Sequence, residues 1–255
     1  MEIERVNVLG VGVSVLDQER ARRYLFDAAR NGTRGYVTVT NIHGVGEVQD
    51  DPALMEIFGR AMLVTPDGMP MVWMGKLQGF SSIQRVYGPD LMLNLCAGSV
   101  EAGFSHFFYG GAPGVAQQLQ RNFEKRFPGI RIVGTYTPPF RELNPDEVAE
   151  LQRLVAEMKP DFFWVGLSTP KQERFMAKYL PLLPDAKIFV GVGAAFDFFT
   201  GRVKQAPRWM MKAGLEWFYR LCQEPRRLFK RYAIFIPLFV FRATKQLLQR
   251  PKRPG

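Results

Sequence analysis

Short apolar segments alternate with amphipathic segments of about ten to fifteen residues along most of this sequence, and this alternation constrains the fold more than any other feature. Because strands joined through helices form right-handed crossovers, the pattern predicts an α/β fold with a mainly parallel sheet and helices on both faces. Strands are expected within 5–17 (two short ones) and at 36–40, 62–65, 106–109, 130–135, 162–166 and 187–192. Helices are expected to start at Gln18, Pro52, Met69, Gly88, Val115, Pro145 and Pro170.

Three of the expected helices carry a recognisable start signal. Asp17, Asp51 and Asn144 each precede a first helical residue, where a short polar side chain can accept hydrogen bonds from the free amides of the first turn. Asn144 is also followed by a proline at the first helical position and by an acidic residue, Glu147, at the third. These signals predict where the helices begin.

Composition places the chain among folded proteins that do not span a membrane. Hydrophobic residues make up 47% of its 255 residues, which is ample for a core. The first five residues are too polar and acidic for a signal peptide, and no uninterrupted apolar run approaches the roughly 20 residues of a spanning helix. Cys96 and Cys222 share no metal or redox motif, so a reduced, cytosolic compartment is expected.

The positive charge is confined to the C-terminal part of the chain. From Arg202 to the end there are 14 Lys/Arg and two Glu, a net charge of +12, whereas the preceding residues carry 20 Lys/Arg and 22 Asp/Glu, a net charge of −2. This asymmetry predicts an α/β catalytic domain at 1–203 and a basic appendage at 204–255 that faces an anionic partner, either membrane or nucleic acid.

The appendage has the pattern of a basic amphipathic helix. Its cationic residues Arg226, Arg227, Lys230 and Arg231 alternate with Leu228, Phe229, Tyr232 and Phe235. The apolar run 232–241 is only ten residues long and is interrupted by Pro237, so it is expected to lie in a membrane interface and not to span it. Further basic residues are then available to anionic headgroups: Arg242, Lys245, Arg250, Lys252 and Arg253.

Polar groups collect at one predicted edge of the sheet. Loops that leave the carboxyl ends of parallel strands share a rim, and this rim would bring together Asn41, Asp67, the Gly110–Gly114 loop, Ser168–Gln172 and Asp197. Asp67 lies in the turn Pro66-Asp67-Gly68, where the proline and glycine end the strand. By itself such an aspartate is an ordinary turn residue, but its position on the rim makes it a candidate site residue.

The Gly110–Gly114 loop opens a helix directly after a strand, and two interpretations remain open for it. Its amides suit a phosphate, or its glycines meet the geometry of a tight turn. The strand 132–137 offers no acidic residue for a ribose, which disfavours an NAD-type oxidoreductase. No metal site is expected, because there is no Asp-x-Asp pair and because His43 and His106 lack ligand-like neighbours. A Ser-His-Asp hydrolase is also disfavoured, because no serine lies in a Gly-x-Ser-x-Gly elbow.

A series of short motifs occurs in a characteristic order along nearly the whole chain, from about Val6 to Tyr232. The motifs are Asn41, Pro66-Asp67-Gly68, Arg85-Val86-Tyr87-Gly88-Pro89-Asp90-Leu91, Tyr109-Gly110-Gly111, Pro170-Lys171-Gln172-Glu173, residues 191–197, Gly201-Arg202-Val203, Ala206-Pro207, residues 214–221 and Glu224-Pro225-Arg226-Arg227. Single motifs of this kind are weak, but the ordered set is specific. The sequence resembles the bacterial WecG/TagA/CpsF glycosyltransferases.

This resemblance implies a Rossmann-like fold and an inverting, metal-independent transfer of a sugar from a UDP-sugar to a polyprenyl-pyrophosphate-linked saccharide, without a cofactor. The reaction would serve cell-surface or exopolysaccharide biosynthesis at the cytoplasmic face of the bacterial inner membrane, with the enzyme bound peripherally. The donor sugar is left open between N-acetylmannosamine, its uronic acid and a neutral hexose such as glucose. Homo-oligomer formation is also left open.

The resemblance also implies residue roles. Asp67 corresponds to the proposed general base, Asn41, Arg85 and Gln172 fall on pocket positions, and Arg220 and Arg227 match appendage arginines implicated in closing the active site. Members of the family often have a threonine two residues before the asparagine that corresponds to Asn41, and this chain has Val39 there. Thr38 and Thr40 flank Val39, and Thr40 is kept as a candidate substrate-binding residue.

Sugar transfer needs a base for the acceptor hydroxyl and positive charge for the leaving diphosphate. Asp67 can supply the first, and Arg85, Arg220 and Arg227 the second, with the Gly110 and Gly111 amides in a secondary role. Two other classes of protein are weighed against an enzyme. One is a non-catalytic scaffold of a polysaccharide assembly complex. The other is a nucleic-acid-binding protein, which is disfavoured because the basic residues alternate with large apolar ones and no reader motif occurs.

Overall fold

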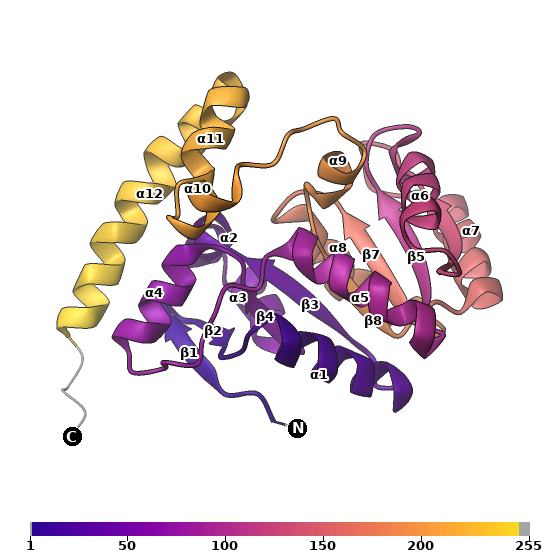
Figure 1. Ribbon diagram of the computed structural model, residues 1–255, viewed down its shortest axis with the longest axis horizontal. Coiled ribbons are helices and arrows are strands. Elements are labelled where there is room, and N and C mark those ends of the chain that lie inside the picture. Colours follow the sequence, from indigo (N-terminus) through magenta and orange to yellow (C-terminus); the bar gives the residue numbers. More distant parts are fainter. Residues whose placement is uncertain (1, 250–255) are drawn as a thin grey trace.

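The core of the protein is a six-stranded sheet in which all strands run parallel. The computed structural model describes residues 2–249. The sheet consists of β3 (Gly35–Thr40), β4 (Leu63–Pro66), β5 (Ser105–Gly110), β6 (Arg131–Tyr136), β7 (Phe162–Gly166) and β8 (Ile188–Gly191), in the order β4-β3-β8-β7-β5-β6 (Figure 1). The predicted mainly parallel α/β fold is confirmed.

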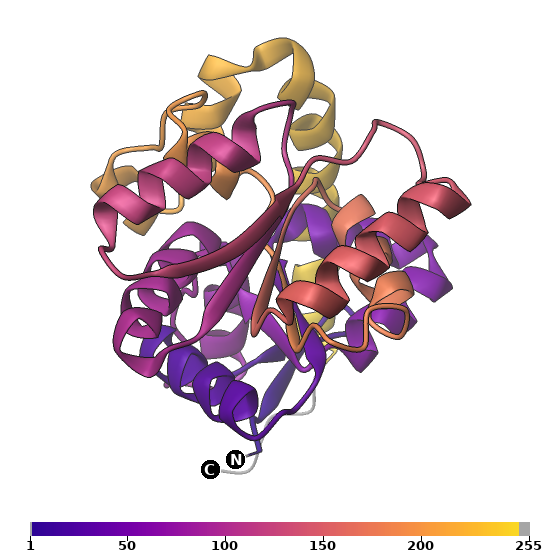
Figure 2. The same ribbon diagram turned by 90° about the vertical axis from the view of Figure 1, so that its right-hand side faces the viewer.

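Helices cover both faces of this sheet, as predicted. One face packs against α1 (Gln18–Arg30), α5 (Gly88–Ala102), α6 (Val115–Arg126) and α9 (Ala195–Phe199). The other packs against α2 (Ile42–Glu47), α3 (Pro52–Arg60), α4 (Met69–Leu77), α7 (Pro145–Met158) and α8 (Lys171–Tyr179), and the short 3₁₀ helix Val48–Asp50 follows α2. Figure 2 shows the twisted sheet between the two sets of helices. In β7, Phe162 and Trp164 enter one core and Phe163 and Val165 the other, so an uninterrupted apolar run is buried on both sides.

The three predicted helix caps are confirmed, whereas the helix expected to start at Pro170 begins one residue later, at Lys171. Asp17 Oδ1 accepts a hydrogen bond from the amide of Arg20 at 2.8 Å, and Asp51 Oδ1 accepts one from the amide of Leu54 at 2.9 Å. Asn144 forms a complete capping box, since its amide donates to the Glu147 carboxylate while its own side chain accepts from the Glu147 amide. Local sequence therefore sets where these three helices begin.

The first two strands do not join the main sheet. β1 (Arg5–Val8) and β2 (Val11–Ser14) form a separate antiparallel hairpin, whose turn places Leu9 and Gly10 at positive φ. The hairpin lies against β4, where the Ser14 hydroxyl accepts a hydrogen bond from the amide of Val64 at 3.0 Å. Its buried valines contribute to the core that contains α3 and α4.

Up to residue 249, the C-terminal part folds into three helices, α10 (Arg208–Lys212), α11 (Glu216–Gln223) and α12 (Pro225–Leu248). The last of these packs along α2 (Figure 1). The helix α12 continues through Pro237, which is exposed, although this residue interrupts the apolar run of the sequence. None of the described helices combines the length and the hydropathy that crossing a membrane requires. The predicted boundary after residue 203 falls in the loop between α9 and α10; of the predicted appendage, Arg250, Lys252 and Arg253 lie outside the described residues.

Candidate active site

A cavity of about 530 Å³ lies between the carboxyl ends of the strands and the C-terminal helices. This volume is in the range of small-molecule sites. Seven of the ten site residues predicted from the sequence line it, namely Asn41, Asp67, Arg85, Gln172, Asp197, Arg220 and Arg227. The loops after β3, β4, β7 and β8 therefore share one rim, and α11 and α12 complete the wall opposite.

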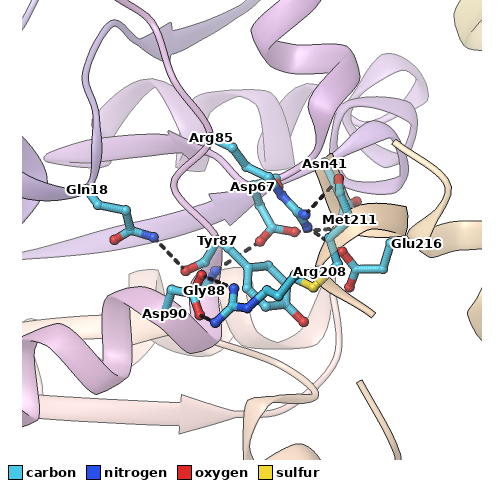
Figure 3. A network of polar contacts seen from close by, with 10 residues as sticks. All are labelled: Gln18, Asn41, Asp67, Arg85, Tyr87, Gly88, Asp90, Arg208, Met211 and Glu216. Atoms are coloured by element: carbon cyan, nitrogen blue, oxygen red, sulfur yellow. Dashed lines mark hydrogen bonds and ion pairs between the residues drawn. The ribbon is translucent and has the colours of Figure 1, made fainter. Parts of the chain in front are cut away.

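Asp67 follows directly after β4 and is held from three directions (Figure 3). Its amide donates to the carbonyl of Thr40 at 2.9 Å, which continues the pairing of β3 with β4 by one residue. Its carboxylate accepts from the amide of Gly88 at 3.0 Å and from the side chain of Asn41 at 3.5 Å. The turn thus presents one carboxylate in a defined orientation at the cavity wall.

Arg85 lies in the loop before α5 and contacts both the Asp67 turn and the C-terminal helices. Its Nε donates to the carbonyl of Asp67, its Nη2 pairs with Glu216 of α11, and its Nη1 donates to the carbonyl of Met211 at 3.4 Å. The guanidinium stacks on the ring of Tyr87 at 4.4 Å. Only 15% of the Arg85 side chain and 18% of the Glu216 side chain are exposed, so this ion pair is largely shielded from solvent.

Opposing influences act on the pKa of Asp67. Burial raises it, because the charged carboxylate loses solvation, and the charge of Glu216 raises it further. The charge of Arg85 and the hydrogen bonds from Gly88 and Asn41 lower it, but the balance is a raised pKa. A carboxylate with a raised pKa is a stronger base than an exposed one, which suits it to accept a proton near neutral pH.

Asn41 and Thr40 support the Asp67 turn in different ways. Asn41 is the N-cap of α2, because its Oδ1 accepts from the amides of His43 at 3.0 Å and Gly44 at 3.4 Å. Its amide group is thereby oriented toward Asp67. Thr40 is buried, its hydroxyl donates to Thr38, and only its backbone contacts the Asp67 turn, so its side chain does not line the cavity.

Gln172 joins two of the rim loops. Its Oε1 accepts from the amide of Gly193, after β8, at 3.0 Å, and its Nε2 donates to the buried carboxyl of Glu173 at 2.9 Å. The hydroxyl of Thr169 also donates to Glu173, at 3.0 Å. Burial raises the pKa of Glu173, which favours its protonated form. Gln172 therefore fixes the loop after β7 relative to the loop after β8.

Three arginines of the C-terminal helices, Arg220, Arg227 and Arg231, line the cavity, and two of them pair with the neighbouring carboxylate of Glu224. Glu224 pairs with Arg220 at 3.4 Å and with Arg227 at 2.5 Å. Arg220 Nε is buried without a hydrogen-bond partner among the described residues. Burial, together with the neighbouring Arg227 and Arg220, lowers the pKa of Arg231, which also lines the cavity. The three guanidinium groups outnumber the two nearby carboxylates, Glu224 and Asp197, so the wall keeps a net positive charge, as an anionic ligand would require.

Asp197 also lies at this wall, at the start of α9. Its carboxylate is 3.6 Å from Arg202, and burial raises its pKa against the opposing charges of Arg202 and Arg227. Asp197 is therefore set among the same basic side chains, where its negative charge limits the net positive potential of the wall.

Gly110 and Gly111 lie outside the cavity, and the structure accounts for them by close packing. Both have positive φ, and a Cβ on Gly110 would lie 2.7 Å from the carbonyl oxygen of Gly166. The amide of Gly111 donates to that same carbonyl at 3.1 Å, so it is not free for a phosphate. Of the two interpretations left open by the sequence, the tight turn fits this geometry.

Sequence reasoning missed Glu216, Tyr87 and Arg231 as cavity residues. Glu216 and Tyr87 do lie within motifs quoted above, but nothing local indicates that Glu216 pairs with a residue 131 positions away. His106 is fully buried in the core, whereas His43 lines the cavity and lies 2.9 Å from the Glu47 carboxylate. Burial lowers the pKa of His106 to about 3 and that of His43 to about 4, the latter assisted by Arg231. No group of three or more His, Cys, Asp or Glu suited to a metal ion occurs between residues 2 and 249.

Comparison with known proteins identifies the family. The model of the glycosyl transferase WecG/TagA/CpsF family matches residues 6–253. The chain belongs to this family. A Bacillus spizizenii protein named N-acetylglucosaminyldiphosphoundecaprenol N-acetyl-beta-D-mannosaminyltransferase is 34% identical over 213 residues, which cover 83% of this chain and 80% of the relative. A Bacillus subtilis protein of the same name is 30% identical over 196 residues, covering 77% and 73%. Membership in the WecG/TagA/CpsF family makes the protein a glycosyltransferase with a Rossmann-like sheet, as predicted from its motifs.

Proposed function

We propose that this enzyme transfers N-acetylmannosamine from a UDP-sugar to the N-acetylglucosamine of a polyprenyl-diphosphate-linked acceptor. The names of the two Bacillus relatives support this sugar and this acceptor. The observation that carries the proposal is the pairing of groups around one cavity: the Asp67 carboxylate on the strand side and the cluster of Arg220, Arg227 and Arg231 on the helical side. Such a transfer needs a base for the acceptor hydroxyl and positive charge for the diphosphate.

In the proposed reaction, an acceptor hydroxyl attacks the anomeric carbon of the donor. Asp67 takes the hydroxyl proton as the new carbon–oxygen bond forms, and the bond from the anomeric carbon to the diphosphate oxygen breaks, so that UDP leaves with the bonding electrons. Arg220, Arg227 and Arg231 stabilise the charge that grows on the diphosphate. Attack opposite the leaving group inverts the anomeric centre. This proposal needs no metal ion, because guanidinium groups supply the positive charge.

The geometry favours a different role for Arg85 from the phosphate contact assigned to it above. Its three hydrogen-bonding nitrogens already contact Asp67, Glu216 and Met211. We infer that Arg85 holds the catalytic turn, while the arginines of α11 and α12 bind the diphosphate. Gln172 is proposed to shape the pocket through its contacts to Gly193 and Glu173.

We further propose that the enzyme binds the cytoplasmic face of the inner membrane through α12. This helix exposes Phe229 (65%) next to Arg226 and Lys230, and it exposes Phe241 (68%) one turn before Lys245. Such a face suits the interface of an anionic bilayer, where the acceptor's polyprenyl chain is anchored. This placement would bring a membrane-bound diphosphate to the cavity that α12 borders.

The decisive experiment offers purified enzyme a panel of UDP-sugars together with an N-acetylglucosamine-diphosphate-lipid acceptor and follows the products by mass spectrometry. We expect the acceptor mass to rise by one N-acetylhexosamine with UDP-N-acetylmannosamine, also in the presence of EDTA. Exclusive use of the uronic acid or of UDP-glucose would replace the proposed sugar. No transfer and no UDP release with any donor would instead favour the scaffold role.

Exopolysaccharide synthesis as the biological setting is a separate proposal, tested by the polymer lost in a deletion strain.

A further inference from the structure

Two side chains from the C-terminal segment reach two of the groups that hold Asp67 in place (Figure 3). They are Glu216, the first residue of α11, and Arg208, the first residue of α10. Neither lies in a strand of the sheet, and each forms its ion pair with an element other than its own helix. Both contact elements that precede them by more than 100 positions in the sequence.

The first support is Arg85, which donates to the backbone carbonyl of Asp67. Its guanidinium is oriented by Glu216 on one side, by the carbonyl of Met211 at 3.4 Å and by the ring of Tyr87. Two of these contacts come from the C-terminal segment. If this segment moves away, Arg85 keeps only the Tyr87 ring and the carbonyl of Asp67.

The second support is the first turn of α5, whose Gly88 amide donates to Asp67 Oδ1 at 3.0 Å. Asp90 in the same turn forms a two-pronged ion pair with Arg208, with distances of 2.6 and 2.9 Å. This pair is more exposed than the first, so we expect it to contribute less. This ion pair connects the start of α10 to the N-terminal end of α5, whose Gly88 amide orients the Asp67 carboxylate.

We propose that Glu216 is a positioning residue for the catalytic base. Through its ion pair with Arg85, it makes the geometry and the charge environment of Asp67 depend on the packing of the C-terminal helices against the sheet domain. Arg208 has the same role to a smaller extent, through its ion pair with Asp90. The inference rests on the proposed role of Asp67. Its consequence is that an enzyme whose C-terminal helices are displaced has a poorly oriented base, so that transfer is coupled to the docked arrangement.

Three ionisable groups face Asp67, and they predict how its titration responds. Arg85 lowers its pKa and Glu216 raises it, whereas burial raises the pKa of Tyr87 so far that this residue stays neutral. Glu216→Gln removes the negative charge of Glu216, whereas the positive charge of Arg85 is retained. The pKa of Asp67 should therefore fall, and the acidic limb of the kcat profile should move to lower pH.

The test compares wild type, Glu216→Gln, Arg208→Gln and Glu142→Gln. Glu142 is a matched control, because it forms an exposed ion pair with Lys178 away from the cavity. We expect Glu216→Gln to lower kcat about tenfold with KM for the donor changed less than threefold, and Arg208→Gln to lower kcat about threefold without moving the pH profile. Glu142→Gln should match wild type. In addition, ¹³C NMR follows the Asp67 carboxyl, identified by its loss in Asp67→Asn.

An unchanged Asp67 titration in Glu216→Gln, or a kcat equal to that of Glu142→Gln, would overturn the inference. A fall in melting temperature with an unmoved titration would do so too, because it would reduce Glu216 to a structural contact. The NMR titration does not depend on turnover. If wild type transfers no sugar, the proposed function fails while the titration still tests whether Glu216 sets the state of Asp67.

Discussion

At the scale of single residues, the site keeps a carboxylate where folding alone would not favour one. Asp67 is enclosed by protein and open only to the cavity, and burial raises its pKa against the pull of Arg85. Such a group costs stability whenever it is ionised. Catalysis and stability therefore place opposite demands on this position, which gives a prediction with two readouts.

Replacing Asp67 with Asn should reduce kcat by about 100-fold or more, because the acceptor proton loses its base. The same variant should gain stability relative to wild type as the pH rises. Folding raises the pKa of Asp67, so between the ordinary carboxyl pKa and the raised value the folded wild type binds more protons than the unfolded chain. The wild type therefore loses stability as the pH increases through this range. Thermal unfolding at a series of pH values checks this. Below the window both proteins hold a neutral side chain there, which provides the control.

His106 offers an independent test of the core. It is fully buried in β5, its Nδ1 accepts from Trp164 Nε1 at 3.0 Å, and burial lowers its pKa to about 3. The folded state therefore binds fewer protons than the unfolded chain between pH 6.5 and about 3, so stability falls as the pH drops through this range.

His106→Phe should lower stability at pH 7, because Trp164 loses its acceptor, but it should flatten the acid dependence. Within this pH range, His106 changes the free energy of unfolding by about 1.4 kcal/mol per pH unit, and the variant loses this contribution. His43, with a pKa of about 4, supplies a similar slope that remains in the variant. Urea unfolding at pH 7, 6 and 5 measures both effects. A slope equal to that of wild type would show that His106 is not held neutral by the fold.

At the scale of elements, the contact between α2 and α12 depends on a glycine, Gly46, which has no side chain. A Cβ on Gly46 of α2 would lie 2.1 Å from the ring of Phe235 in α12, and the same ring contacts His43 edge-on at 5.0 Å. Glycine at this position lets the two helices approach closely. The C-terminal helices are thus held at several places, which include Phe235 on α2, Glu216 on Arg85, Arg208 on Asp90, and Gln246 on the turn of the N-terminal hairpin.

Gly46→Ala should therefore loosen α12, and Phe235→Ala should rescue it by removing the ring. Amide hydrogen exchange of residues 225–248 is expected to speed up in Gly46→Ala and to return toward wild type in the double variant. Gly59→Ala is the matched control. Gly59 also lies in a helix, but a Cβ there meets nothing within 4 Å, so this change should stabilise the protein by up to about 1 kcal/mol. Equal exchange in Gly46→Ala and wild type would contradict the close contact.

At the scale of the whole molecule, the charge asymmetry seen in the sequence coincides with an architectural one. The near-neutral part of the chain forms the sheet and its helices, whereas the strongly basic part forms a helical wall that closes the cavity and exposes large apolar side chains. One segment thus supplies the proposed diphosphate site and the proposed membrane contact. This arrangement would make substrate access and membrane binding properties of the same helices.

Phe229→Ser and Phe241→Ser should each weaken binding to anionic vesicles about tenfold or more, since each removes an aromatic side chain from the exposed face of α12. Binding by the wild type should also fall on raising NaCl from about 0.1 to 0.5 M, because the basic residues are screened. Vesicle flotation with anionic and zwitterionic lipids measures both.

Phe140→Ser supplies the control for these variants, because Phe140 is 92% exposed but lies outside the C-terminal helices. Flotation of this variant should match that of wild type. If all three variants float like wild type, the membrane contact lies elsewhere on the protein.

Local features of the sequence determined the order of elements and much of their chemistry. Caps such as Asp17 and Asn144, the end of β4 at Pro66-Asp67-Gly68 and the buried run of β7 follow from hydrogen bonds and side-chain patterns among neighbours along the chain. The rim position of Asp67 also followed, because parallel strands must end at a common edge.

Only the tertiary structure decided how those residues are used. Three features depend on contacts between residues that are remote in the sequence. They are the ion pair of Arg85 with Glu216, the close packing of Gly110 and Gly111, and the contact of the Phe235 ring with Gly46. The pKa of Asp67 has the same origin, because burial and nearby charges exist only once β4, α5 and α11 have come together. The sequence by itself determined that Asp67 stands at the rim; the folded chain decided what holds it there.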